Sequence, residues 1–102
     1  MSINREHAKN CVGKGWSNLI DTIYDKLPPS ACVSQVKEKF GGLRFYVDGI
    51  DDKIYAFIEE IENQSYKICE VCSRPGKQRN KYGWIKTLCD IHFFFLFHNA
   101  ET

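Results

Sequence analysis

The chain has 102 residues, of which 26% are charged and 43% are hydrophobic, and its formal net charge at pH 7 is +1. This length predicts one domain with a modest core, and the charge excludes a chain that is a polycation or a polyanion as a whole. The longest apolar run, residues 91–97, is interrupted by His92 and is far too short to span a bilayer, so we expect no membrane partner.

The N-terminal third predicts a short helical turn around residues 4–11, which Gly13 and Gly15 end, and then a longer helix from Trp16 to Leu27. Pro28 and Pro29 end this second helix. Its apolar residues recur at helical spacing on one face and comprise Trp16, Leu19, Ile20, Ile23, Tyr24 and Leu27. We expect this face to point into the core.

A β-hairpin is predicted over residues 32–47, where apolar and basic residues alternate. Gly41 and Gly42 can supply the two positive φ angles of a tight turn. A two-residue loop at these glycines pairs Phe40 with Leu43 on the apolar face.

The opposite face of this hairpin is basic. The predicted pairing places Lys39 opposite Arg44, with Lys37 on the same face, and opposed like charges repel one another unless an anionic partner lies between them. We therefore take Lys37, Lys39 and Arg44 as candidate partner-binding residues, with a merely solvated face as the alternative. Glu38 falls on the apolar face, where it needs a bulge that turns it outward or an arginine or tryptophan N–H as a partner.

A further helix is predicted from Lys53 to Ile68, with Asp51 or Asp52 as its N-cap. Its buried stripe is expected to comprise Ile54, Phe57, Ile58, Ile61, Ser65 and Ile68. Its acidic outer face is expected to comprise Glu59, Glu60 and Glu62.

Two short pairs of metal-ligand residues follow this helix. Cys69 and Cys72 form one pair, Cys89 and His92 form the other, and sixteen residues separate the two. This is the spacing of a four-ligand Zn²⁺ site, in which each pair holds one edge of a tetrahedron, and a zinc ion with four protein ligands is structural and not catalytic. The alternatives are buried thiols with a core histidine, a redox C-x2-C pair, or His98 in place of His92 as the fourth ligand.

The segment between and after the two pairs predicts a turn at residues 73–76, strands at 77–81 and 83–88, and a helix from Asp90 onward. A knuckle, a hairpin and a helix that carries the last ligands resemble the treble-clef zinc finger, so we assign a zinc-finger subdomain to residues 69–98. The helix from Lys53 runs almost directly into it, which favours one rigid unit.

The last helix contains a nearly apolar stretch, Phe93 to Phe97, and a polar tail follows from Asn99 to Thr102. A helix that is apolar all round is usually buried on more than one side, so we expect this stretch in the core, with an exposed aromatic patch as the alternative. The predicted fold is α+β: a small single domain over residues 1–102, with two helices packed on a β-hairpin and a C-terminal treble-clef-like zinc finger.

The run KEKFGGLRFYV at residues 37–47, together with the later CEVCSRPG, GW and TLCDIH motifs, resembles a group of small uncharacterised bacteriophage and prophage proteins. Their helix, hairpin, helix and C-terminal zinc finger follow in the same order, over about residues 16–92. The resemblance implies a phage or bacterial cytoplasmic setting and no particular activity. The five cysteines also agree with a cytoplasmic location, because disulfide pairing explains their positions poorly.

Three functions are compatible with these features, and the first is non-enzymatic binding of nucleic acid or of nucleic-acid-handling machinery. From Val71 to Cys89 the chain has five basic residues and no acidic one. Cations reach phosphates and aromatic rings stack on bases. The candidate residues of this basic loop are Arg74, Lys77, Arg79, Lys81, Trp84 and Lys86, with Tyr82 among them.

The second function is inhibition of a host enzyme or a defence system by protein binding, with the Phe-rich end as a hydrophobic anchor. The third is a treble-clef nuclease. That chemistry needs a general-base histidine and an open metal position, and only His7 and His98 remain once His92 is a ligand.

Overall fold

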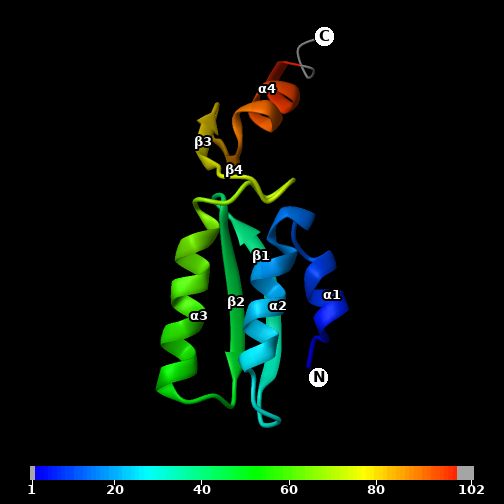
Figure 1. Ribbon diagram of the computed structural model, residues 1–102, viewed down its shortest axis with the longest axis vertical. Helices are drawn as coiled ribbons and strands as arrows, with labels where there is room; N and C mark the ends of the chain where they lie inside the picture. The colour runs from blue at the N-terminus through cyan, green and yellow to red at the C-terminus, as the bar shows by residue number, and fades with distance from the viewer. Residues whose placement is uncertain (1, 99–102) are drawn as a thin grey trace.

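An antiparallel hairpin with two helices against it forms the larger part of the molecule, and a smaller hairpin and helix lie at one end of it (Figure 1). The structure is a computed structural model that describes residues 2–98, so the predicted polar tail at residues 99–102 lies outside the described part. The molecule is elongated, with dimensions of 49, 23 and 22 Å.

The described residues confirm the α+β class and the predicted order of elements. The elements are α1 (Arg5–Asn10), the 3-10 turn η1 (Lys14–Trp16), α2 (Ser17–Lys26), β1 (Cys32–Lys39), β2 (Gly42–Asp48), α3 (Asp52–Ser65), β3 (Lys77–Lys81), β4 (Trp84–Leu88) and α4 (Asp90–His98). The side chains of Asn4 and Asp51 cap α1 and α3 by accepting the backbone N–H groups of His7 and Ile54.

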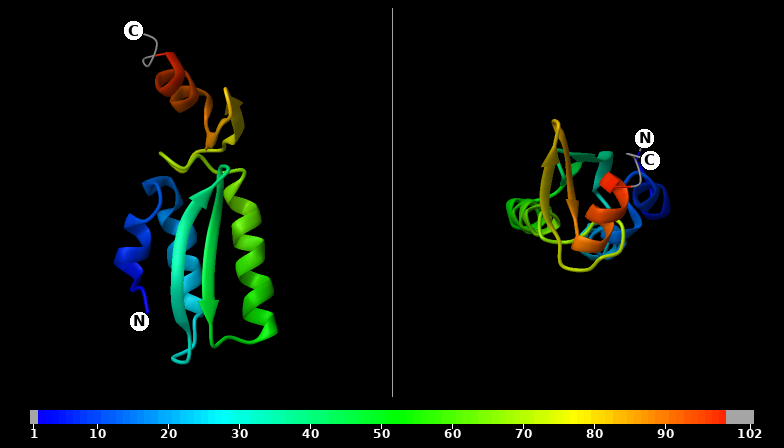
Figure 2. Two further views of the ribbon diagram at one scale, coloured as in Figure 1. Left: turned by 180° about the vertical axis from the view of Figure 1, so that it is seen from behind. Right: turned by 90° about the horizontal axis from the view of Figure 1, so that it is seen from above.

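The core lies between α2, α3 and one face of the β1–β2 hairpin, and the rear view in Figure 2 shows the face that the helices leave open. Tyr24 of α2 meets Phe45 of β2 edge to face, with ring centroids 5.6 Å apart. The buried residues of this core are Ala8, Trp16, Leu19, Ile20, Ile23, Val33, Val36, Leu43, Phe45, Ile58 and Ile61. Each large aliphatic side chain buried here contributes about 1.5–3 kcal/mol.

The turn between β1 and β2 lies one residue earlier than predicted. Lys39 pairs with Gly42, so Phe40 and Gly41 form the two-residue loop, with φ angles of 55° and 82°. The predicted Gly41–Gly42 turn and the predicted pairing of Phe40 with Leu43 are therefore wrong. Phe40 is not on the apolar face; it is 56% exposed.

Gly42 has a different role from the one predicted. A Cβ atom at this position would lie 2.3 Å from the ring of Tyr66, so only glycine lets that ring approach β2. The corrected register also changes the basic face, because Lys37, and not Lys39, lies opposite Arg44.

The outer edge of β2 is covered by side chains of α3 and not by a third strand. Ser65 Oγ accepts the Leu43 N–H at 2.8 Å, and Glu62 Oε2 accepts the Phe45 N–H at 2.8 Å. The prediction that Glu62 belongs to the acidic outer face is wrong, because its carboxylate faces the sheet edge. Covering an edge in this way satisfies backbone groups that would otherwise pair with another chain.

The predicted burial of the Phe-rich stretch is wrong for the side chains that the structure describes. Phe94, Phe95 and Leu96 are 55%, 52% and 41% exposed, and Phe93 is half-buried. The physical reason is the position of α4, which projects from the end of the molecule and does not reach the core between α2 and α3 (Figure 1). Within residues 2–98, no helix combines the length and the apolar character needed to cross a membrane.

Candidate metal centre

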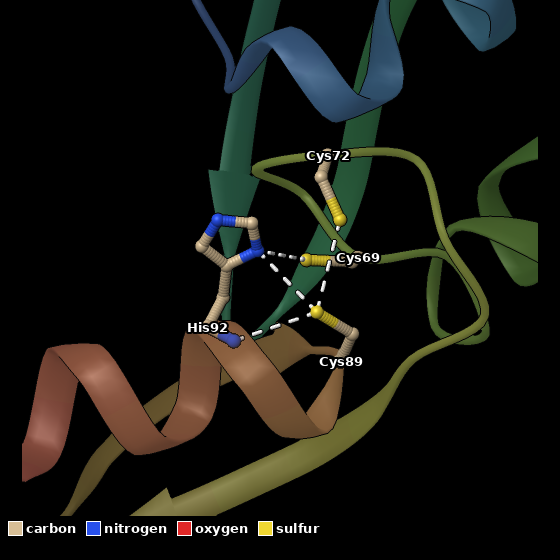
Figure 3. A group of neighbouring side chains, drawn as sticks. All are labelled: Cys69, Cys72, Cys89 and His92. Atoms are coloured by element: carbon tan, nitrogen blue, oxygen red, sulfur yellow. Dashed lines mark hydrogen bonds between the residues drawn. The ribbon is translucent and has the colours of Figure 1, made fainter.

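Four potential metal ligands converge where the second hairpin meets α4. Cys69 and Cys72 lie in the knuckle after α3, Cys89 lies between β4 and α4, and His92 lies in the first turn of α4 (Figure 3). Their ligand atoms all lie within 4.8 Å of one another. The predicted set is therefore brought together, and it could hold a metal ion.

Three sulfur atoms and one ring nitrogen face the same point. The sulfurs of Cys72 and Cys89 are 3.7 Å apart. His92 Nδ1 is 3.7 Å from the sulfur of Cys69 and 3.3 Å from the sulfur of Cys89. The histidine thus presents Nδ1 to the cluster. His98, the alternative ligand, has a side chain outside the described part.

Hydrogen bonding favours the thiolate form of one ligand. The backbone N–H of His92, 3.5 Å from the Cys89 sulfur, is the largest cause that lowers the pKa of this thiol to about 6. Burial opposes this effect, and the His92 ring and the thiols of Cys72 and Cys69 add to it. Because the thiolate is the form that binds metal, this donor set fits a metal ion.

The knuckle is attached to the core by hydrogen bonds from the turn before α2. The indole N–H of Trp16 donates to the Ile68 carbonyl at 2.9 Å, and the Gly15 N–H donates to the Glu70 carbonyl at 2.9 Å. Ser73 Oγ returns a bond to the Gly15 carbonyl at 2.7 Å. A Cβ atom on Gly15 would lie 2.0 Å from the Cys69 carbonyl oxygen, so glycine is required for this close approach.

A polar network makes a second attachment, between the two hairpins. Lys86 Nζ lies 2.7 Å from Glu38 Oε1 and 3.4 Å from Glu70 Oε1. Glu70 Oε2 accepts the N–H of Thr87, whose hydroxyl donates to the Gly41 carbonyl. Glu38, for which the alternation predicted a need for a partner, thus finds a lysine from the second hairpin.

Among the candidate partner-binding residues, Arg79 and Lys86 form ion pairs within the protein. Besides Lys86, the Arg79 guanidinium pairs with Asp90 at 2.7 Å and lies 4.5 Å from the ring centroid of Phe93. The side chain of Arg79 is only 12% exposed. Both residues therefore stabilise the segment around the metal cluster.

The remaining candidates lie on two surfaces. On the second hairpin and its approach, Arg74, Lys77 and Trp84 are exposed and Lys81 is half-buried. On the open face of the first hairpin, Lys39 is exposed and Lys37 and Arg44 are half-buried. The structure brings the four potential metal ligands together in one cluster, but it does not bring these candidates together in one patch.

Sequence reasoning missed Glu70 and Thr87, both of which are buried. No local signal marks them, because a glutamate inside a cysteine knuckle and a threonine in a short strand are usually solvated.

Comparison of the chain with family models, curated proteins and solved structures found no match. We therefore infer the function of the chain from the geometry of this centre and of the surfaces beside it.

Proposed function

We propose that the chain is a non-enzymatic zinc-binding protein that binds nucleic acid through the exposed parts of its two hairpins. Zinc is supported by the ligand spacing. Bonds of about 2.3 Å to sulfur and about 2.0 Å to nitrogen, in a tetrahedron, place two sulfurs about 3.8 Å apart and a sulfur and a nitrogen about 3.5 Å apart. Three of the ligand pairs lie close to these values, at 3.7 Å between the sulfurs of Cys72 and Cys89 and at 3.7 and 3.3 Å between His92 Nδ1 and the sulfurs of Cys69 and Cys89, and all four ligand atoms lie within 4.8 Å of one another.

The order of elements supports a treble-clef-like finger. The knuckle with Cys69 and Cys72 comes first, the β3–β4 hairpin follows, and α4 carries His92 in its first turn. Four protein ligands complete a tetrahedral shell and leave no position for a reacting water, so the ion would be structural. Among the described side chains the nuclease alternative has no such support, since His7 lies in α1 and is not in the group of potential metal ligands, and the His98 side chain lies outside the described part.

The charge of the finger carries the nucleic-acid proposal. Residues 69–98 contain five basic and two acidic residues, and both acids pair with basic residues of the same segment, Asp90 with Arg79 and Glu70 with Lys86. The excess positive charge of this segment therefore includes the exposed residues Arg74 and Lys77. Aromatic rings lie among them: Tyr82 is 95% exposed and Trp84 is 44% exposed. Cations with exposed rings are the usual means of holding a phosphate backbone and its bases.

A salt titration tests this function. We expect a fluorescently labelled oligonucleotide to bind with an affinity that falls as salt rises, with a log–log slope of about −0.7 for each phosphate contacted on a single strand. Lys77→Glu should weaken binding and flatten the slope. Lys53→Glu is the matched control, because Lys53 is also exposed but lies at the start of α3, at the other end of the molecule. Equal effects of the two substitutions, or no binding at low salt, would contradict the proposal.

A second candidate function, inhibition of a host protein, is favoured by α4. Ile91, Phe94, Phe95 and Leu96 are each between 41% and 55% exposed, and apolar side chains exposed together often mark a protein contact. This candidate predicts that a defined host protein is recovered by affinity capture after nuclease treatment, and that Phe94→Asp abolishes the recovery. Recovery only without nuclease would favour the first function.

A further inference from the structure

Both hairpins turn through the same local sequence, a lysine, an aromatic residue and a glycine, at residues 39–41 and 81–83. The backbone repeats as well. Phe40 and Tyr82 have φ angles of 55° and 56°, and the glycine that follows each has a φ of 82° or 83°. Positive φ at both loop positions is the geometry of a type I′ turn, which matches the twist of antiparallel strands.

An aromatic residue is a costly choice for the first position of such a turn. The left-handed region favours glycine, asparagine and aspartate, and any bulky residue there carries a penalty of about 1 kcal/mol or more. Burial does not offset that penalty, because Phe40 is 56% exposed and Tyr82 is 95% exposed. Strain that burial does not offset, repeated at both turns, indicates positions that serve binding and not stability.

Each of the two rings has a cation beside it. The Lys39 ammonium lies 5.6 Å from the centroid of the Phe40 ring, and the Lys81 ammonium lies 5.8 Å from that of Tyr82. A ring face next to a positive charge matches one unit of a nucleic-acid strand, because the base stacks on the ring and the phosphate meets the cation.

The two turns have a fixed relation to each other. Gln78 Nε2 donates to the Phe40 carbonyl at 2.7 Å, so the tip of the first hairpin lies against the beginning of β3. Tyr82 follows Gln78 by four residues, which at about 3.3 Å per residue places the second tip about 13 Å further along β3. A flexible strand can follow that distance, and its unpaired bases expose the faces that stacking requires.

We propose that Phe40 and Tyr82 are base-stacking residues and that the ligand of these two turns is single-stranded nucleic acid. This inference rests on the proposed nucleic-acid function and narrows it, because duplex bases are already stacked on one another and offer no face to a ring. The adjacent lysines supply the salt-dependent part of the affinity and the rings supply the part that depends on bases.

Asparagine substitutions test the rings without damaging the turns. Asparagine followed by glycine is a preferred type I′ pair, so Phe40→Asn and Tyr82→Asn should keep or raise the thermal midpoint of unfolding. Each should nevertheless weaken binding of a labelled oligodeoxythymidine by about fivefold or more, the value expected for one lost stacking contact. A structural role alone would move stability and affinity in the same direction.

Two matched controls accompany these variants. Tyr55 on α3 is as exposed as Phe40, at 56%, so Tyr55→Asn removes an equivalent ring away from the turns and should leave the affinity unchanged. An abasic oligonucleotide of the same length keeps the phosphates and removes the bases, and it should bind the wild-type protein about as weakly as oligodeoxythymidine binds the doubly substituted protein.

The outcomes separate this inference from the function on which it rests. If the wild-type protein binds neither single strands nor a duplex, the nucleic-acid function itself is wrong. The stacking assignment alone is overturned if the protein binds oligodeoxythymidine but the asparagine variants keep wild-type affinity. The same conclusion follows if the abasic strand binds as tightly, or if a duplex of equal length binds more tightly.

Discussion

The carboxylate of Glu38 on β1 lies 2.7 Å from the ammonium group of Lys86 on β4, and this ion pair joins the two hairpins. The side chains of Glu38 and Lys86 are only 21% and 24% exposed, so water screens the pair less than it screens a surface pair. The second oxygen of Glu38 accepts the Gly41 N–H at 2.7 Å, which connects the pair to the β1–β2 turn. The contact thus fixes the orientation of the segment with the four potential metal ligands on the larger hairpin.

Removal of the cation from this pair should destabilise the protein. Lys86→Met keeps the aliphatic stem but leaves the carboxylates of Glu38 and Glu70 facing each other without a positive charge. We expect a loss of about 2 kcal/mol in the free energy of unfolding, measured by urea denaturation at pH 7. Lys77→Met is the control, because Lys77 is exposed, and it should cost less than about 0.5 kcal/mol. The pair has no structural role if both variants lose the same amount of stability, or if the loss for Glu38→Gln combined with Lys86→Met is as large as the sum of the two single losses.

Loss of the metal should unfold the segment that the four ligands hold. Zinc bound to zinc-finger peptides contributes about 10–16 kcal/mol of apparent binding free energy, which is also folding free energy. We therefore expect one zinc ion per chain by elemental analysis of purified protein, and unfolding of at least residues 69–98 in Cys69→Ser, in Cys89→Ser or after chelation.

Cysteines outside the cluster provide the control for this prediction. Cys11 is an exposed free thiol, so Cys11→Ser should retain the metal and the thermal midpoint of the wild-type protein. Full thermal stability of Cys69→Ser, or purified protein without metal, would refute the structural role of the centre.

A single added methyl group should separate the knuckle from the core. Gly15→Ala would place its Cβ atom 2.0 Å from the backbone carbonyl oxygen of Cys69, and a backbone atom has no alternative rotamer. We expect a loss of more than about 2 kcal/mol and weaker metal binding. Gly83→Ala is the contrast, because its Cβ atom would meet nothing within 4 Å and would cost only the strain of the φ of +83°, about 1 kcal/mol. The close approach is not needed for stability if Gly15→Ala is the milder of the two.

Glu62 should make the stability of the protein depend on pH. Burial raises the pKa of this carboxyl above its ordinary value of 4.5, while the Phe45 N–H and Arg44 partly oppose the shift. A raised pKa in the folded state means that protonation favours folding. The stability that this group contributes is thus complete below about pH 4.5 and is lost as the pH rises through the folded-state pKa.

Comparison of two substitutions isolates this effect from the other carboxylates. Glu62→Gln keeps an acceptor for the Phe45 N–H without a charge, so the variant should equal the wild type at low pH and exceed it at pH 7. Glu62→Ala leaves that N–H without its acceptor and should be about 1 kcal/mol less stable than Glu62→Gln at every pH. Urea midpoints measured from pH 4 to pH 8 would show this. A stability difference between Glu62→Gln and wild type that does not change with pH would contradict the assignment.

The sequence alone was sufficient for the features that depend on short-range spacing. Helical periodicity identified the faces of α2 and α3, because residues three and four positions apart lie on one side of a helix whatever packs against it. The spacing of Cys69, Cys72, Cys89 and His92 identified the four residues that come together and could hold a metal ion, because each pair can span one edge of a tetrahedron without help from the rest of the chain.

Tertiary structure decided what depends on neighbours distant in sequence. Both Gly41 and Gly42 tolerate positive φ, so local pattern could not choose the turn, and the ring of Tyr66 over Gly42 is a contact that alternation does not encode. The Glu62 carboxylate faces β2 because the Phe45 N–H at the edge of that strand needs a hydrogen-bond acceptor.

The remaining differences have the same physical cause. Lys86 and Arg79 have the same charge as Arg74 and Lys77, and only the positions of Glu38 and Asp90 in space determine which of the four are engaged in ion pairs. The apolar composition of α4 predicted burial, but β3, β4 and α4 lie at one end of the molecule, so α4 does not reach the core between α2 and α3. Composition shows which side chains would be stabilised by burial. The positions of whole helices and strands decide which of those side chains are buried.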